Sequence, residues 1–250
     1  MIPLKDDIPT RRFPILTVAI IVICALVYFG FEHGVWSLGA FGNQKVVDYG
    51  AIPYELSHPG QHCIQQGQQV ACGTGVPDSV STWLTVFSSM FMHGSFLHLA
   101  GNMLFLWIFG NNIEDSMGRP RFVLFYLLGG VAAIAGQTLI DPNAVAPTVG
   151  ASGAIAAVLG AYALLYPRAR VVTVVFIIIF FTILELPALI VLGLWFLLQV
   201  AYGASNLSGA SGGVAYFAHI GGFLFGLLAI KLFANRVQDD YQQSHRVPVY

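Results

Sequence analysis

This chain of 250 residues contains few charged residues. Asp, Glu, Lys and Arg make up 9% of the sequence, whereas soluble globular domains carry roughly 25%. The formal net charge is -1, so no basic field favours nucleic acid. Neither a glycine-rich phosphate loop nor an iron–sulfur spacing of cysteines occurs. We therefore expect no nucleic acid, no cofactor, and partners that lie within lipid.

Apolar residues dominate what remains. They make up 56% of the chain, and the mean hydropathy is +0.74, which indicates a membrane protein with several spans. The first apolar run is too long for the core of a signal peptide and lacks a convincing Ala-x-Ala cleavage site, so we interpret it as a retained helix. Apolar segments fall at residues 13–31, 95–113, 121–140, 152–166, 171–202 and 214–234.

The segment 171–202 is too long for one span of roughly 20 residues. Glu185 and Pro187 interrupt it, and a proline disfavours helix at the residue before it. We therefore expect residues 171–184 to lie at one membrane interface, or to dip into it, and a span to run from residue 187 to 202. The predicted fold class is all-α, a polytopic membrane protein with a six-helix bundle.

The cations predict the orientation of these spans. Ten of the eleven Lys and Arg residues flank ends that six alternating spans place on one side, and only Lys45 lies on the other. Such residues are retained on the cytoplasmic side, so we expect a multi-pass protein of the plasma (inner) membrane with both termini cytoplasmic. The predicted organisation is an N-terminal segment 1–12, a membrane domain 13–236 and a C-terminal tail 237–250.

The first connection, about residues 32–80, then becomes a long external loop. It contains Cys63 and Cys72, and an oxidising compartment permits a disulfide between them. His58 and His62 leave zinc as an alternative, but the spacing matches no standard zinc site, and we expect no metal. Cys24 lies inside the first span, where we expect it to pack as a small hydrophobe.

Two polar residues fall within the last apolar segments. Ser152 lies in the turn Gly150-Ala-Ser-Gly153 and His219 in the segment Ala218–Gly222. A helix over residues 152–166 is only about 22 Å long, shorter than the hydrocarbon layer of about 30 Å, so the serine begins below the membrane surface at a depth similar to that of the histidine. Small residues at four-residue spacing follow both and favour close helix packing, which is the alternative explanation for these glycines.

A serine and a base at one depth permit acyl transfer. Ser152 would attack a peptide carbonyl while His219 takes its proton and later delivers it to the leaving amine. No third acid is evident, so we expect a Ser-His dyad rather than a triad. His98 and Asn102 lie four residues apart and therefore on one helix face; with the backbone N–H of Ser152 they would stabilise the oxyanion.

These residues resemble the rhomboid family of intramembrane serine proteases. Four motifs carry the resemblance, which extends from Trp83 onward: His98-x-x-x-Asn102, Gly110-x-x-x-Glu114-x-x-x-Gly118, Gly150-Ala-Ser-Gly153 and Ala218-His-x-x-Gly222. The resemblance implies a six-helix rhomboid-like bundle, Ser152 as nucleophile, His219 as base, and His98 and Asn102 at the oxyanion. It also implies cleavage of single-span membrane proteins near the outer end of their helix.

The resemblance assigns further roles. It suggests that His93 and Glu114 are structural, that the loop 203–213 covers the site, and that Trp195 and Phe196 border a lateral entrance. Some family members carry an aromatic residue four positions after the nucleophile, where this chain has Ala156, so what orients His219 is left open. A catalytically inactive rhomboid-like protein that binds membrane clients is the main alternative; a transporter or channel is another, although no inverted repeat is visible.

Overall fold

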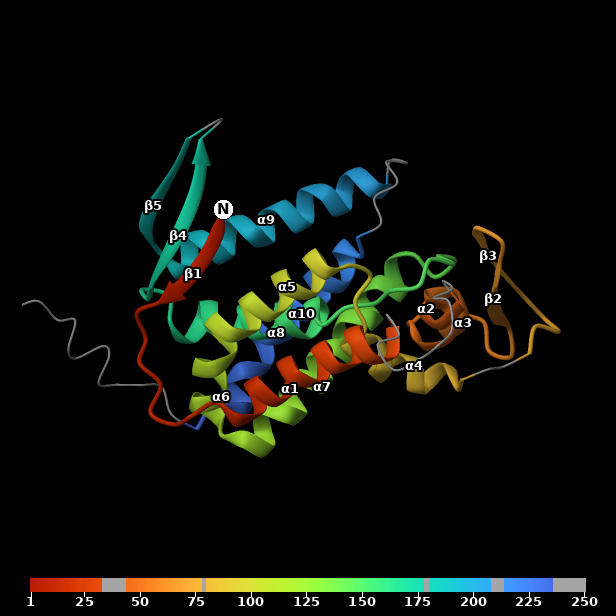
Figure 1. Ribbon diagram of the computed structural model, residues 1–250, viewed down its shortest axis with the longest axis horizontal. Coiled ribbons are helices and arrows are strands. Elements are labelled where there is room, and N and C mark those ends of the chain that lie inside the picture. Colours follow the sequence, from red (N-terminus) through yellow and green to blue (C-terminus); the bar gives the residue numbers. More distant parts are fainter. Residues whose placement is uncertain (33–43, 78–79, 178–179, 208–213, 236–250) are drawn as a thin grey trace, which may run out of the picture.

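A computed structural model describes residues 1–32, 44–77, 80–177, 180–207 and 214–235. The described part is mainly helical, with two small sheets at opposite ends of a helix bundle (Figure 1). The helices of the bundle are α1 (Ile15–Leu26, continued by the π-helix η1, Val27–Glu32), α5 (Phe96–Phe105), η3 (Leu106–Gly110), α6 (Asn111–Met117), α7 (Arg119–Ile140), α8 (Ser152–Leu165), α9 (Ala188–Leu207) and α10 (Tyr216–Phe233).

Four of these helices are long and apolar enough to cross a membrane, namely Ile15–Glu32, Arg119–Ile140, Ala188–Leu207 and Tyr216–Phe233. α8 is apolar but has only 14 residues, which corresponds to about 21 Å. α5, η3 and α6 follow one another from Phe96 to Met117. The chain is thus a helical protein with several membrane spans, as its composition predicts, while the arrangement as six spans stays a prediction.

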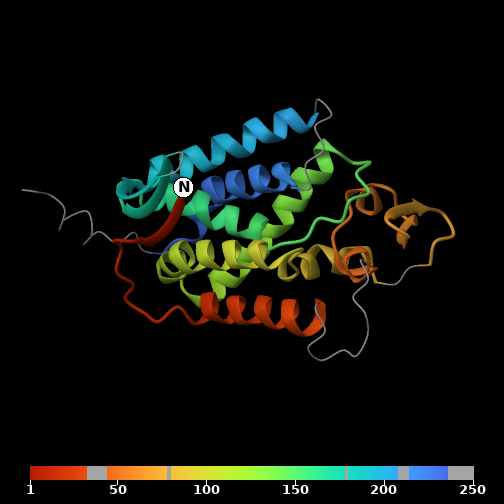
Figure 2. The ribbon, with the colours of Figure 1, turned by 45° about the horizontal axis from the view of Figure 1, so that its top comes forward.

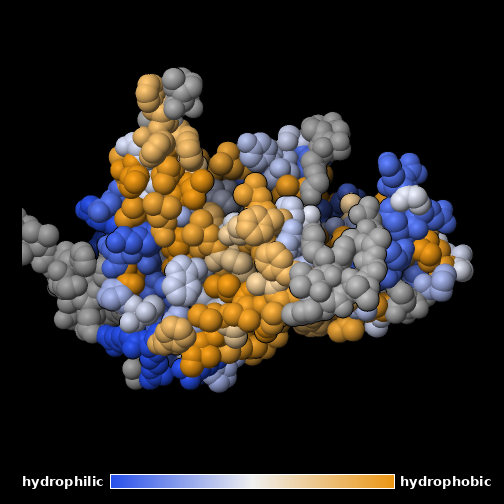
Figure 3. Space-filling view, in the orientation of Figure 1, coloured by the Kyte–Doolittle hydropathy of each residue, from blue (hydrophilic) through white to orange (hydrophobic). Residues whose placement is uncertain are grey.

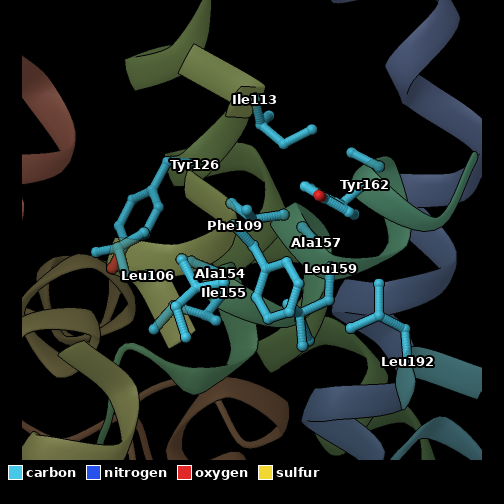
Figure 4. Close-up of a cluster of buried hydrophobic side chains, with 14 of the residues drawn as sticks. Leu106, Phe109, Ile113, Tyr126, Ala154, Ile155, Ala157, Leu159, Tyr162 and Leu192 are labelled. Carbon is cyan, nitrogen blue, oxygen red and sulfur yellow. The ribbon is translucent and has the colours of Figure 1, made fainter. Parts of the chain in front are cut away.

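α8 lies at the centre of the bundle, and Figure 2 shows the long helices running side by side around it. Every residue from Gly153 to Ala163 is buried. Side chains of η3, α6, α7 and α9 enclose the middle of this helix, and Figure 4 shows the cluster that they form with it. A helix buried on all sides holds its first residue, Ser152, in a fixed place relative to the helices around it.

Glycines bring α10 very close to α8. A Cβ atom on Gly222 would lie 2.1 Å from the carbonyl oxygen of Gly153, and one on Gly226 would lie 2.0 Å from that of Ala157. No side chain fits at such distances, so only glycine permits this contact between the two backbones. The close packing predicted from the small residues is therefore present.

One end of the bundle, here called the arginine end, carries Arg11, Arg12, Arg119, Arg121, Arg168 and Arg170 together with a three-stranded sheet. The sheet consists of β1 (Ile2–Asp6), β4 (Arg170–Ile177) and β5 (Phe180–Pro187), in the order β1-β4-β5 with antiparallel neighbours. The fold is therefore mainly helical, as predicted, but it is not all-α. Residues 171–184 are rich in Val, Ile, Phe and Thr, whose branched and aromatic side chains favour strands over helix, and they form a β-hairpin.

Buried polar contacts tie the arginine end together. The carboxylate of Asp6 accepts hydrogen bonds from the hydroxyl of Tyr162, at 2.5 Å, and from the side-chain amide of Asn112, at 2.6 Å; burial raises the pKa of Asp6 to about 6. Glu114 is buried and accepts bonds from the N–H groups of Leu16 and Thr17 at the start of α1. The structural role expected for Glu114 is confirmed, because a carboxylate at a helix N-terminus satisfies donors that the helix leaves free.

The opposite end, here called the disulfide end, holds the connection between the first two long helical segments. Its described part forms the elements α2 (Gln44–Tyr49), α3 (Pro53–Ser57), β2 (His62–Gln66), β3 (Gln69–Gly73), α4 (Thr82–Ser88) and the short 3₁₀ helix η2 (Ser89–Phe91). A disulfide joins Cys63 and Cys72 across β2 and β3, so the predicted bridge is confirmed and these sulfur atoms are not available to zinc. Cys24 is fully buried, in agreement with its expected packing role.

Candidate active site

The side chains of Ser152 and His219 meet. Nε2 of His219 lies 2.7 Å from Oγ of Ser152, although 67 residues separate them in the sequence. The serine is the first residue of α8 and the histidine lies in the first turn of α10. The contact follows from the close packing of these two helices at the glycines of α10.

The turn before Ser152 depends on a glycine. Gly150 has a φ of +133°, which side chains disfavour, and a Cβ atom there would lie 2.8 Å from Nε2 of His98 and 3.5 Å from Oγ of Ser152. Its N–H donates to the carbonyl of Ser89, which fixes the turn against η2. The glycine thus lets the backbone, His98 and the serine hydroxyl share one small space.

Gln199 of α9 completes the contacts of His219, and sequence reasoning missed it. Its Oε1 lies 2.8 Å from Nδ1 of His219, while its Nε2 donates to the carbonyl of Trp195 at 3.4 Å. Because that carbonyl can only accept, the amide oxygen faces the imidazole, and Nδ1 must carry the hydrogen. Nε2 is then free to accept the hydrogen bond of the serine hydroxyl.

The imidazole is also held by an aromatic ring. The ring centroid of Trp195 lies 5.8 Å from that of His219, with 37° between the planes. Trp195 and Gln199 are one turn apart on α9 and reach the histidine together. Although α8 carries Ala156 in place of an aromatic residue, the imidazole of His219 is oriented by these two side chains of α9. The available signal was a single amide in an apolar segment, which belongs to none of the four motifs.

His98 lies beside the serine, and Asn102 follows one turn later on α5. Ser95 caps this helix, accepting the N–H of His98 at 3.2 Å. The side-chain nitrogen of Asn102 is buried and has no hydrogen-bond partner, which leaves a donor unused. His93 packs edge-on against His98, with ring centroids 5.2 Å apart, and its backbone N–H donates to the buried carboxylate of Glu32.

A cavity of about 500 Å³ opens over the pair. Ser152, His219 and His98 all line it, together with Gly150, Met90, Ala133 and Val214; Asn102 lies outside this lining. The loop predicted to cover the site, residues 203–213, begins later than expected, because α9 continues to Leu207. Residues 208–213 of this loop lie outside the described residues. In the part of the chain that the structure describes, no group of three or more His, Cys, Asp or Glu residues gathers for a metal ion.

The arrangement contains a serine hydroxyl, an imidazole nitrogen within hydrogen-bond distance of it, and an amide oxygen that contacts the other imidazole nitrogen. These are the parts needed to activate a hydroxyl for attack on a carbonyl. They lie among apolar helices in a chain with several membrane spans. Fold and site together define a polytopic membrane protein with a serine–histidine pair.

Comparison with known proteins identifies the family. Residues 80–236 match the family model described as Rhomboid domain, and this range holds Ser152, His219, His98 and Asn102. The chain belongs to the rhomboid family, as its motifs predict.

Several relatives are similar over part of their length. Rhomboid protein 1, mitochondrial, of Saccharomyces cerevisiae is 32% identical over 60% of this chain and 42% of that protein. Presenilin-associated rhomboid-like protein A, mitochondrial, of Danio rerio is 32% identical over 62% of this chain and 38% of that protein. Rhomboid protease GluP of Bacillus subtilis is 37% identical over 32% of this chain and 15% of that protein. The chain spans less than half the length of each.

Proposed function

We propose that this protein is an intramembrane serine endopeptidase that cleaves single-span membrane proteins through Ser152 and His219. The observation that carries the proposal is the distance of 2.7 Å between Nε2 of His219 and Oγ of Ser152. The imidazole takes the serine proton as the oxygen attacks the substrate carbonyl, and returns it to the leaving amine. Water then attacks the acyl-enzyme with the same base.

Donors near the serine support a role in binding the oxyanion. The first N–H groups of a helix have no partner within the helix, and α8 begins at Ser152 itself. His98 stands beside the serine and Asn102 has a free side-chain donor. Each such donor contributes roughly 2.7–4 kcal/mol to the stability of the transition state in known hydrolases.

Gln199 has a positioning role in this proposal. Its amide oxygen holds the hydrogen on Nδ1 of His219, so the base keeps the tautomer that can accept from serine. A neutral amide does the orienting that a carboxylate does in a Ser-His-Asp triad, without placing a charge in the membrane.

The distribution of cations supports an orientation in the membrane. The arginine end carries most of the Lys and Arg residues, which favours the cytoplasmic side, and the disulfide end favours an oxidising exterior. Substrates would then be cut towards the outer face. The plasma (inner) membrane remains our proposal; the relatives from Saccharomyces cerevisiae and Danio rerio are mitochondrial proteins.

A fluorophosphonate probe tests the proposed function. The reagent phosphonylates an activated serine with loss of fluoride, so it should label the protein and leave Ser152→Ala unlabelled. Ser205→Ala, at an exposed serine on α9 outside the cavity lining, is the matched control and should label normally. Equal labelling of the unmodified protein and Ser152→Ala would reject the proposed protease activity. It would favour a rhomboid-like protein that binds membrane clients without cleaving them.

Replacing Gln199 tests the orientation of the base. Gln199→Met keeps the size of the side chain but loses the hydrogen bond, and a mispositioned base should lower kcat by up to about 100-fold with little change in KM. Gln199→Glu restores an acceptor. It should recover activity at high pH and move the acid limb of the pH–rate profile to higher pH, because a carboxylate favours the protonated imidazole. A Met variant with unchanged kcat would contradict the role.

A further inference from the structure

The hairpin of β4 and β5 is apolar on both of its faces. No charged residue occurs from Val171 to Leu184. Phe180 and Phe181 are neighbours in one strand, so their side chains point to opposite faces, yet they are 73% and 69% exposed. Phe176 on β4 is 58% exposed. A sheet with one side in water alternates apolar and polar residues, and this hairpin does not.

The hairpin extends sideways from the bundle. Figure 1 shows it rising from the arginine end past the first turns of α9, roughly at right angles to the helices. The space-filling view places its apolar surface at the rim of the apolar band that covers the helices, between hydrophilic residues at the two ends (Figure 3). Exposed Leu189 and Ile190 continue this surface onto α9. Because the hairpin is roughly at right angles to the helices, it extends along the plane of a membrane that these helices span.

The base of the hairpin is held in place, while its outer half is free. β1 pairs with β4 from Val171 to Val174, the N–H of Ala188 donates to the carbonyl of Ala169 at 2.7 Å, and Arg170 lies 3.8 Å from Glu185. These contacts end before the exposed phenylalanines. Because these contacts fix the base of the hairpin, its apolar outer half projects away from the bundle.

The backbone of β5 limits how deep the hairpin can lie. In the described part of the chain β5 pairs with β4 alone, so its other edge presents N–H and C=O groups without a strand partner. Such groups are too costly to leave in hydrocarbon, whereas headgroups and water satisfy them. Figure 1 shows β5 as the outermost strand, on the side towards the arginine end.

We propose that the β4–β5 hairpin is a lateral membrane anchor that lies at the boundary between headgroups and acyl chains, in the leaflet at the arginine end. Its two apolar faces contact lipid, and the free edge of β5 faces the headgroups. Lipid fits better than a protein partner because a docked protein would cover one face, while both faces are exposed and apolar. The inference is independent of catalysis.

Nitroxide labels in liposomes test this anchor. In a Cys24→Ser background, single labels at Phe180→Cys and Phe181→Cys report each face, Leu197→Cys on α9 reports lipid, and Gln66→Cys on the disulfide end reports water. Both hairpin labels should collide with oxygen in preference to a water-soluble nickel chelate, with a ratio several-fold above that of Gln66→Cys. Thermal melting of each labelled protein beside its unlabelled parent selects the variants that are folded.

Three results would overturn the anchor. Both hairpin labels could match Gln66→Cys, which would place the hairpin in water. One label alone could be shielded from both oxygen and the chelate, which would indicate a protein on that face. Spin–spin broadening that disappears on dilution with unlabelled protein would mean that a second copy pairs with the edge of β5.

Discussion

Replacement of His219 by Asn should abolish client cleavage while the client still binds. The expected fall in kcat is roughly 10⁶-fold, the size found when the serine or the histidine of such a unit is removed. The cause is the loss of proton transfer from Oγ of Ser152, which stands 2.7 Å from the imidazole. Cleavage of a single-span client in liposomes measures kcat, and crosslinking to the same client measures binding. His62→Asn on the disulfide end controls for loss of a histidine elsewhere.

The two residues should also act as one unit. If Oγ of Ser152 and Nε2 of His219 take part in one step, the double variant Ser152→Ala/His219→Asn should have the same residual rate as either single variant. Independent contributions would instead multiply the two losses. Losses that multiply, or cleavage that survives in His219→Asn, would reject the proposed dyad even if Ser152 reacts with a probe.

The sequence predicts the long helices well because each is a long apolar segment between more polar connections. Predicted segments at 121–140 and 214–234 correspond to Arg119–Ile140 and Tyr216–Phe233. Ser152 and His219 could be found from two glycine-rich turns that open apolar stretches, since a polar residue costs free energy in lipid and marks a site when it persists. The contact between Ser152 and His219 depends on the close approach of the α8 and α10 backbones, which only glycine allows.

Two features escaped prediction for physical reasons. Residues 171–184 are apolar enough to indicate a membrane segment, but apolarity does not distinguish a lipid-contacting strand from a helix. These residues form strands because their side chains are branched and because they pair with β1, which lies more than 160 residues earlier in the sequence. Gln199 escaped because its partner is distant in sequence. An amide carries no charge and belongs to no motif, so only the structure connects it with His219.

Substitution of Gly222 by Val should damage both folding and catalysis. A Cβ atom at this position would lie 2.1 Å from the carbonyl oxygen of Gly153, next to the serine, and a backbone oxygen cannot rotate away. α10 would have to move from α8 by more than about 1 Å, a displacement that costs roughly 100-fold in rate when it separates reacting groups. Overpacking of this kind also destabilises by about 1–3 kcal/mol.

The matched control for Gly222→Val is Gly193→Val on α9, where a Cβ atom would meet nothing within 4 Å. It places the same residue type in a membrane-spanning helix without a collision, so its probe labelling and melting temperature should stay near those of the unmodified protein. Gly222→Val should lose most of its fluorophosphonate labelling, because the base no longer reaches the serine. Normal labelling and melting in Gly222→Val would mean that the contact between α8 and α10 tolerates separation, and that this glycine does not set the distance between Ser152 and His219.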